Sequence, residues 1–348
     1  MLERSQVKTL PEVFSKRVAQ TPMKLAYQYF DKAENKWISI NWRELYVKSL
    51  AYRHAINAEK LAPGSRILLA IENSIDWICL EQAALQLGHI VVAVSPLESL
   101  QRIRQIIEDC EPSLAIFESD RLLESLQLTK KPRCIVLNKY LSDFKAPLLE
   151  QWLQENKDQS STANNSVSES DIATIIYTAG TSGVAKGVML SHQSIINNAL
   201  TCAQMFSTNE NDKFLSVTPF SHIMGRVVDY YQSMLIGAPL VFNKALGMIE
   251  ESVKRTHPTI LNCTPYILEC AYHDLIKPHP AAKKGIEKYL DYRNGIGSWR
   301  FSFLLKPFLL YQLKKHIRQH LLVSLRAIYT GGASLSNTTL ALINELDL

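Results

Sequence analysis

Residues 177–187, with the sequence YTAGTSGVAKG, carry the densest set of groups that could do chemistry. Glycines in this run let backbone amides turn toward one point, and the hydroxyls of Thr178, Thr181 and Ser182 can donate hydrogen bonds to oxygen atoms. Lys186 adds a positive charge, and the run contains no acidic residue. Amides, hydroxyls and an ammonium group gathered in this way suit a ligand with several phosphates.

Two other interpretations compete for the same run. A glycine-rich hairpin with a solvated Lys186 would use the same residue types, because turns between strands favour them, and composition alone leaves this alternative open. A Walker A loop would need Ser or Thr directly after the lysine, followed by a helix. Here Gly187 follows the lysine, and the strand-like sequence GVMLS comes next. The sequence therefore argues against a kinase or ATPase of the Walker A kind.

Alternating strands and helices are expected to position this run. Predicted strands before it cover residues 66–71, 90–94, 114–118 and 134–137, and predicted helices cover 42–58, 74–87 and 97–109. Asn41 and Glu44 have the spacing of a capping box for the first of these helices. Its predicted apolar face consists of Leu45, Leu50, Ala51 and Ala55. Strand, helix, strand, helix is the pattern of a parallel sheet with helices on its faces.

A polar segment at residues 155–170, ENKDQSSTANNSVSES, is typical of a linker or surface loop. Strands are predicted after it at 172–178, 187–191, 214–219, 239–242 and 325–330, with a helix at 194–206 and a helix-rich stretch at 247–323. The predicted organisation is an N-terminal α/β subdomain at 1–154, the linker, and a second α/β subdomain at 171–348.

Composition narrows the class of protein. The 348 residues are 47% apolar and 20% charged, as in globular proteins with a large core. The net charge of +5 comes from interspersed residues without a basic stripe, which argues against a nucleic-acid partner. Six cysteines without a CxxC pair indicate reduced thiols, so no metal site is predicted. Because neither a signal peptide nor an 18-residue apolar run is visible, a cytoplasmic location is expected.

The longer run YTAGTSGVAKGVMLSH, residues 177–192, resembles the signature loop of the adenylate-forming (AMP-binding) superfamily, which includes acyl-CoA synthetases, luciferases and nonribosomal adenylation domains. Ala179 and Ala185 depart from the commonest pattern, and VAKG looks like the version found in bacterial long-chain fatty acid ligases. The resemblance extends over the chain from residue 8 and includes LSVTPFSHIMGR at 215–226 and LRAIYTGGASLS at 325–336.

The resemblance implies roles for particular residues. His222 would border the acyl site, and Lys186 and His222 are the catalytic candidates. Without the resemblance, His222 would be interpreted as a loop histidine and GGA as a turn; the order and spacing of the three motifs favour the functional interpretation. The residues implied in nucleotide binding are Thr178, Gly180, Thr181, Ser182, Gly183, Lys186, Gly331, Gly332 and Ala333.

The implied reaction is attack of a carboxylate on the α-phosphate of ATP, which gives acyl-AMP and pyrophosphate, and then transfer of the acyl group to a thiol. ATP, Mg²⁺ and coenzyme A are therefore expected. Donors and cations around the phosphates stabilise the transition state, and a carboxylate that is already ionised needs no general base. Amino-acid-activating relatives have an Asp in the motif at residues 219–223; here Phe220, Ser221 and His222 favour an uncharged acyl group.

The insertion between Pro265 and Arg326 also resembles long-chain fatty acid ligases. Residues 299–322 mix aromatic, aliphatic and basic side chains. They would either contact a membrane surface peripherally or form a core helix pair that is broken at Pro307.

In the resembled family the next elements are a Tyr-Gly-x-Thr-Glu segment whose Glu helps to hold Mg²⁺, an Asp that holds the ribose, a hinge and a mobile C-terminal domain with the adenylation Lys. The 348 residues contain none of these. The expectation is an α/β fold with parallel-rich sheets flanked by helices, forming an incomplete N-terminal part of a long-chain acyl-CoA synthetase that needs the missing portion for activity. The alternatives are an inactive protein that binds nucleotide or acyl ligand, and a fatty acyl-AMP ligase that serves a carrier protein.

Overall fold

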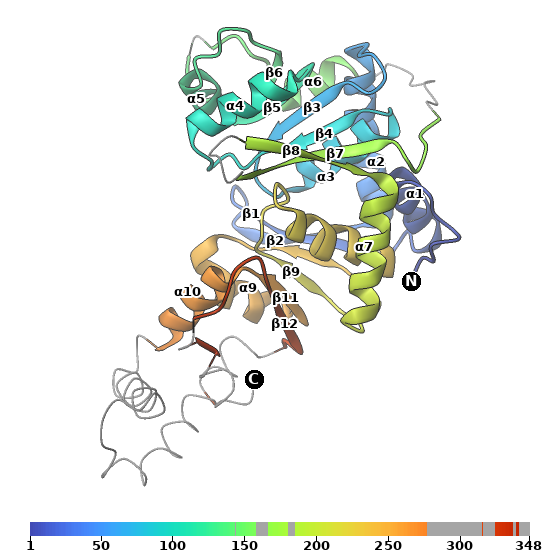
Figure 1. Ribbon diagram of the computed structural model, residues 1–348, viewed down its shortest axis with the longest axis vertical. Coiled ribbons are helices and arrows are strands. Elements are labelled where there is room, and N and C mark those ends of the chain that lie inside the picture. The colour runs from blue at the N-terminus through green and yellow to red at the C-terminus, as the bar shows by residue number, and fades with distance from the viewer. Residues whose placement is uncertain are drawn as a thin grey trace. The chain divides into compact units, whose positions relative to one another are not determined.

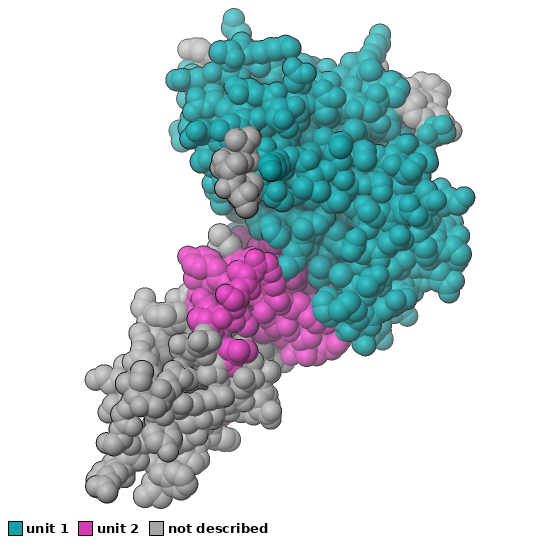
Figure 2. Space-filling view, in the orientation of Figure 1, with its two compact units in different colours: residues 1–211, 219–242 teal, residues 212–218, 243–348 magenta. Residues whose placement is uncertain are grey.

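The computed structural model describes residues 1–142, 144–157, 166–179, 185–276, 315, 324–336 and 339–340. These residues belong to two compact units, which Figure 2 colours separately. Unit 1 comprises residues 1–211 and 219–242, and unit 2 comprises residues 212–218 and 243–348. The linker predicted at 155–170 lies partly outside the described residues, and the subdomain boundary placed there stays a prediction.

A six-stranded sheet in unit 1 has the strand order β6-β5-β3-β4-β7-β8. All neighbouring strands are parallel except the last pair, β7 and β8, which form an antiparallel hairpin. The strands are β3 (Arg66–Ala70), β4 (Ile90–Ala93), β5 (Leu114–Ser119), β6 (Arg133–Asn138), β7 (Ile172–Ala179) and β8 (Ala185–Ser191). This confirms every strand predicted between residues 66 and 191.

Helices cover both faces of this sheet (Figure 1). On one face, Leu68 and Ala70 of β3 belong to the same buried cluster as Ile103 and Ile107 of α4, whereas the alternating residue Ile67 is buried on the other face. The helices are α2 (Trp42–Ala58), α3 (Ile75–Gln86), α4 (Leu100–Cys110), α5 (Asp120–Ser125), α6 (Leu149–Glu155) and α7 (His192–Met205). Apolar residues at alternating positions of the strands are thus buried on both faces of the sheet.

Helix α2 confirms the predicted capping box. The Asn41 side chain accepts a hydrogen bond from the Glu44 N–H, and the Glu44 carboxylate accepts one from the Asn41 N–H, both at 2.9 Å. Its predicted apolar face needs a correction, because Leu50 and Ala51 are only half-buried. The helix instead buries Trp42, Leu45, Ser49, Tyr52, Ala55 and Ile56.

Unit 1 also contains a hairpin that the sequence analysis did not predict. Strand β1 pairs antiparallel with β2 and parallel with β10. The elements involved are α1 (Leu10–Gln20), β1 (Leu25–Asp31), β2 (Lys36–Asn41), a π-helical segment (Gly225–Tyr231), α8 (Gln232–Ile236) and β10 (Leu240–Phe242).

Helix α8 ends at Gly237, which has a φ of +82°. A Cβ atom there would lie 2.6 Å from the guanidinium of Arg17, which donates hydrogen bonds to the carbonyls of Met234 and Leu235. A glycine is therefore needed at this helix end for two reasons, its backbone conformation and the space that the arginine takes.

The described residues of unit 2 include three parallel strands in the order β9-β11-β12, with Ile260 opposite both Phe214 and Ala327. Its elements are β9 (Phe214–Ser216), a short 3₁₀ helix (Leu246–Met248), α9 (Ile249–Thr256), β11 (Ile260–Cys263), α10 (Pro265–Ile276) and β12 (Ala327–Thr330). Strand β11 was not predicted within the helix-rich stretch; its residues are completely buried, and such apolar runs suit a buried strand as well as a helix.

The fold is α/β, with parallel-rich sheets flanked by helices, as predicted. No helix in the described part of the chain is long and apolar enough to cross a membrane. Apart from Lys315, the stretch 299–322 lies outside the described residues, so peripheral membrane contact stays a prediction.

Candidate functional site

The hairpin of β7 and β8 positions the two ends of the predicted phosphate loop. In its register Thr178 lies opposite Lys186, and Ala179 lies opposite Ala185. Residues 180–184, which include Gly180, Thr181, Ser182 and Gly183, lie outside the described residues. The loop begins at the carboxyl end of β7, the end of parallel strands at which α/β proteins bind ligands.

Lys186 is exposed, as is Thr178 across the hairpin. Among the residues that the structure describes, no carboxylate forms an ion pair with Lys186. An ammonium group in water without a partner keeps its whole charge available for an incoming anion. These features fit the predicted role of Lys186 in binding phosphate.

His222 is exposed and lies in unit 1, directly before the helical segment of residues 223–236. The ring Nδ1 of His222 accepts a hydrogen bond from the backbone N–H of Met224 at 3.2 Å. The backbone N–H of His222 donates to the carbonyl of Pro219 at 2.9 Å. Because Nδ1 is an acceptor, the neutral ring carries its proton on Nε2. The Nε2–H is therefore the group that His222 can offer to a ligand.

Phe220 anchors the segment that carries His222. Its ring is completely buried, with its centroid 4.9 Å from that of Trp77 and 5.3 Å from that of Tyr230. Its backbone N–H donates to the side-chain oxygen of Asn73 at 2.8 Å. Aromatic pairs in this geometry add to the stability gained from burial alone, so the position of His222 is fixed by the core two residues away.

Arg226 anchors the same segment from the other side, and the sequence analysis did not identify it. Its backbone N–H donates to the carbonyl of His222 at 3.2 Å, and its guanidinium is 1% exposed. The guanidinium pairs with the completely buried Glu81 and donates to the Thr174 hydroxyl at 2.9 Å. It also lies 4.9 Å from the centre of the Trp77 ring. The sequence did contain a signal for this pair, because Glu81 and Arg226 are charged residues within largely apolar helical sequences. Charged residues that are buried in such helices are usually paired.

The hydrogen bond between Arg226 and Thr174 connects two parts of the candidate site. Thr174 lies in β7, four residues before Thr178, and Arg226 lies four residues after His222. The Thr174 hydroxyl also donates to the carbonyl of Val91 in β4 at 2.6 Å. A hydrogen-bonded path therefore runs within unit 1 from the His222 segment to the strand that begins the phosphate loop.

Gly331, Gly332 and Ala333 belong to unit 2, where they follow the carboxyl end of β12. Gly332 has a φ of +86°, and no described residue lies within 4 Å of the position that a Cβ atom would take. Gly332 and Ala333 are exposed and Gly331 is half-buried. The backbone of this turn is thus accessible to a ligand, as the predicted role requires.

An ion pair fixes the start of β12. Arg326 donates to both carboxylate oxygens of Asp212 at 2.6 Å, and Asp212 also accepts a hydrogen bond from the Thr259 hydroxyl at 2.7 Å. The Asp212 side chain is 4% exposed and that of Arg326 is 41% exposed. Paired hydrogen bonds of this kind favour a single orientation of the arginine, and so of the strand that leads to Gly331.

The AMP-binding enzyme family matches this chain over residues 14–346. The chain belongs to this family. An AMP-binding enzyme is what the signature loop at residues 177–192 led us to expect.

Two curated relatives and one solved structure illustrate the range of this AMP-binding family. A long-chain-fatty-acid–CoA ligase of Homo sapiens is 26% identical over 305 residues, which cover 80% of this chain and 44% of the relative. A chloroplastic long-chain-fatty-acid–acyl-carrier-protein ligase of Arabidopsis thaliana is 21% identical over 309 residues, which cover 82% of this chain and 42% of the relative. The chain thus spans less than half the length of these relatives.

The fold is similar to that of a fatty acyl-adenylate ligase from L. pneumophila, whose structure was determined with acyl adenylate and pyrophosphate. The TM-score is 0.71 at 18% sequence identity, and the alignment covers 100% of this chain and 55% of the other. The similarity identifies the fold of this AMP-binding chain as that of adenylate-forming enzymes.

Proposed function

We propose that this chain carries the phosphate-binding part of a site that forms acyl-AMP from ATP and a carboxylic acid. The observation that carries the proposal is the exposed Lys186, which lies opposite Thr178 at the ends of the signature loop and has no ion-pair partner among the described residues. In the proposed reaction a carboxylate oxygen bonds to the α-phosphorus of ATP, the bond from that phosphorus to the bridging oxygen breaks, and pyrophosphate leaves.

The chain's own residues would bind and orient the nucleotide. Lys186, Thr178 and residues 180–183 would hold the β- and γ-phosphates, and Lys186 would neutralise charge that develops on pyrophosphate. His222 would offer its Nε2–H between the nucleotide and the acyl group, and residues 331–333 would line the adenine and acyl pocket. These roles stay proposals.

Mg²⁺ would supply further positive charge to the phosphates. In the described part of the chain no group of three His, Cys, Asp or Glu side chains could hold a metal ion.

The proposed substrate is a long-chain fatty acid, with coenzyme A as the acceptor. Support comes from residues 219–223, which contain no carboxylate that could pair with a substrate amine, and from the relative that is a long-chain-fatty-acid–CoA ligase. Transfer to a carrier protein is the second candidate, because another relative is an acyl-carrier-protein ligase of similar coverage.

The first test is equilibrium binding of ATP to the 348-residue chain and to its Lys186→Ala variant. The loss of a charged hydrogen-bond donor is expected to weaken ATP binding by roughly ten- to a hundredfold. Lys32→Ala is a matched control, because Lys32 is also exposed but lies in the turn between β1 and β2. Equal ATP affinities for wild type and Lys186→Ala would refute the proposed phosphate site.

The second test concerns turnover. We expect ATP–pyrophosphate exchange to depend on a fatty acid and not on an amino acid, and to require the C-terminal portion that the resemblance implies. Binding of ATP without exchange, even when that portion is supplied, would instead favour the inactive binding protein.

A further inference from the structure

Tyr177 and Gly187 face each other across the hairpin, directly beside the loop ends. A Cβ atom on Gly187 would lie 3.1 Å from Cζ of Tyr177 and 2.8 Å from Cγ2 of Ile175. The Tyr177 ring therefore crosses the space that a side chain at residue 187 would fill. Packing of an aromatic ring over a glycine in the opposite strand is a known way to stabilise such a pair.

The Tyr177 hydroxyl donates a hydrogen bond to the carboxylate of Asp109. Asp109 lies in the last turn of α4, and α4 is held to the sheet by the buried residues Ile103, Ile106 and Cys110. The carboxylate is thus presented by a helix that the core fixes in place. Burial and this hydrogen bond raise the pKa of Tyr177 above its ordinary value, so the hydroxyl remains a donor at neutral pH.

Tyr177 precedes Thr178, and Gly187 follows Lys186, so this contact lies one residue from both phosphate-binding candidates. We infer that Asp109 and Tyr177 are positioning residues for the phosphate loop: the hydrogen bond fastens the loop end of the hairpin to α4 and so sets where Thr178 and Lys186 meet the ligand. This inference rests on the proposed function.

The β- and γ-phosphates are the groups that the loop is proposed to hold, and AMP lacks both. Loss of the Asp109–Tyr177 hydrogen bond should therefore weaken the binding of ATP and leave the binding of AMP unchanged. A bond that served only the stability of the fold would not change the ratio of the two affinities in protein that remains folded.

The experiment measures equilibrium dissociation constants for ATP and AMP with the 348-residue chain, well below its unfolding transition. Tyr177→Phe and Asp109→Ala should each weaken ATP binding by about three- to tenfold, because a single hydrogen bond contributes this much. The double variant should be no weaker than either single variant, since both remove the same interaction. Asp109→Asn, which keeps an acceptor oxygen, should restore most of the affinity.

Tyr140→Phe is the matched control, because Tyr140 is exposed, lies in unit 1 and is distant in sequence from the hairpin. It should bind ATP as wild type does.

The outcomes separate the inference from the proposed function. If ATP binding depends on Lys186 but is unchanged in Tyr177→Phe and Asp109→Ala, the inference is wrong and the phosphate site stands. If Tyr177→Phe and Asp109→Ala weaken the binding of ATP and the binding of AMP by the same factor, the hydrogen bond serves only the structure, and the inference is also wrong. If wild type and Lys186→Ala bind ATP equally, the proposed function fails, and the inference fails with it.

Discussion

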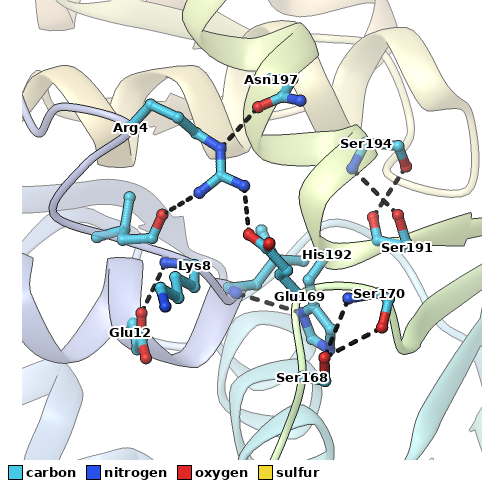
Figure 3. Close-up of polar contacts among 12 residues, drawn as sticks. Arg4, Lys8, Glu12, Ser168, Glu169, Ser170, Ser191, His192, Ser194 and Asn197 are labelled. Carbon is cyan, nitrogen blue, oxygen red and sulfur yellow. Dashed lines mark hydrogen bonds and ion pairs between the residues drawn. The ribbon is translucent and has the colours of Figure 1, made fainter.

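The two ends of the β7–β8 hairpin are held in different ways. At the loop end, Ala185 belongs to a buried core cluster against which Tyr177 packs, and the Tyr177 hydroxyl donates one hydrogen bond to the exposed Asp109. At the opposite end, β8 continues into α7 at His192, which is 2% exposed and accepts a hydrogen bond at Nδ1 from the Leu10 N–H. Figure 3 shows this second end.

Further contacts surround His192 in Figure 3. Arg4 pairs with Glu169 at 2.5 Å and donates to the side chain of Asn197 at 2.8 Å. The backbone N–H groups of His192 and Gln193 donate to the carbonyls of residues 171 and 169. The beginning of the chain, the segment before β7 and the start of α7 are therefore linked at one place.

The difference between the two ends of the hairpin indicates which end contributes to the stability of the fold and which end to ligand binding. The buried end, together with the Arg226–Thr174 contact in the same strand, is held by buried polar contacts, whereas the loop end presents the exposed Thr178 and Lys186. Binding residues are generally carried by loops that a rigid scaffold positions. We therefore expect substitutions at the buried end to change stability and substitutions at the loop end to change ligand affinity.

The largest effect is expected from Arg226→Met, which would leave Glu81 charged and buried without its partner. Removing one member of a buried ion pair costs about 3–5 kcal/mol. Urea unfolding should show this loss in the free energy of unfolding, and the double variant Arg226→Met/Glu81→Met should recover much of it. An Arg226→Met variant as stable as wild type would show that the Arg226–Glu81 ion pair does not stabilise the fold.

Acid should weaken the buried end. Burial lowers the pKa of His192 to about 4, although the nearby carboxylates of Asp171 and Glu12 act in the opposite direction. Below the ordinary pKa of 6.5 the unfolded chain takes up a proton that folded His192 refuses, so stability present above pH 6.5 is lost as the pH falls toward 4. The loss attributable to His192 is about 3 kcal/mol at most.

This prediction can be checked by measuring unfolding free energies between pH 7 and pH 4. His192→Asn keeps an acceptor for the Leu10 N–H but does not titrate, so its stability should fall less. Burial also lowers the pKa of His89, so His89 contributes to the pH dependence of stability that remains in the His192→Asn variant. His257→Asn is the control, because His257 is exposed and has a φ of 50°, which asparagine tolerates. If the free energy of unfolding depends on pH in the same way for wild type and His192→Asn, His192 is excluded as the source of the loss of stability in acid.

A smaller effect is expected from Gly187→Ala at the loop end. The added methyl group would meet Ile175 and Tyr177 and displace the ring, which should cost about 1–3 kcal/mol by analogy with overpacked cores. ATP affinity should fall in the same variant. Gly247→Ala is the matched control, because none of the residues that the structure describes lies within 4 Å of its Cβ position. Thermal unfolding that shows no difference between the two variants would contradict the packing of Tyr177 over Gly187.

The smallest effect is expected from Arg4→Ala. The side chains of Arg4 and Glu169 are 32% and 38% exposed, and ion pairs at such sites contribute less than about 1 kcal/mol. Raising the salt concentration should diminish even this difference in unfolding free energy. A loss as large as that in Arg226→Met would show that surface contacts, and not buried ones, hold this end of the hairpin.

Local patterns predicted those features that depend on neighbours in the sequence. Apolar runs located every strand from β3 to β8, and the spacing of Asn41 and Glu44 located the start of α2. Strand β11 was missed because short apolar runs fit a buried helix equally well. The β1–β2 hairpin was not predicted, since its strands are half-polar and β1 also pairs with β10, more than 200 residues away in the chain.

The sequence by itself indicated the α/β class through its periodicity and the family through a continuous motif, and the same motif predicts the residues of the phosphate loop. Only the tertiary structure decided which side chains support that motif. Asp109 and Tyr177 lie 68 residues apart, and Arg226 and Glu81 lie 145 residues apart. A local pattern can indicate that a charged residue is buried, but it does not identify the partner, since the two partners are brought together by the packing of elements distant in the chain.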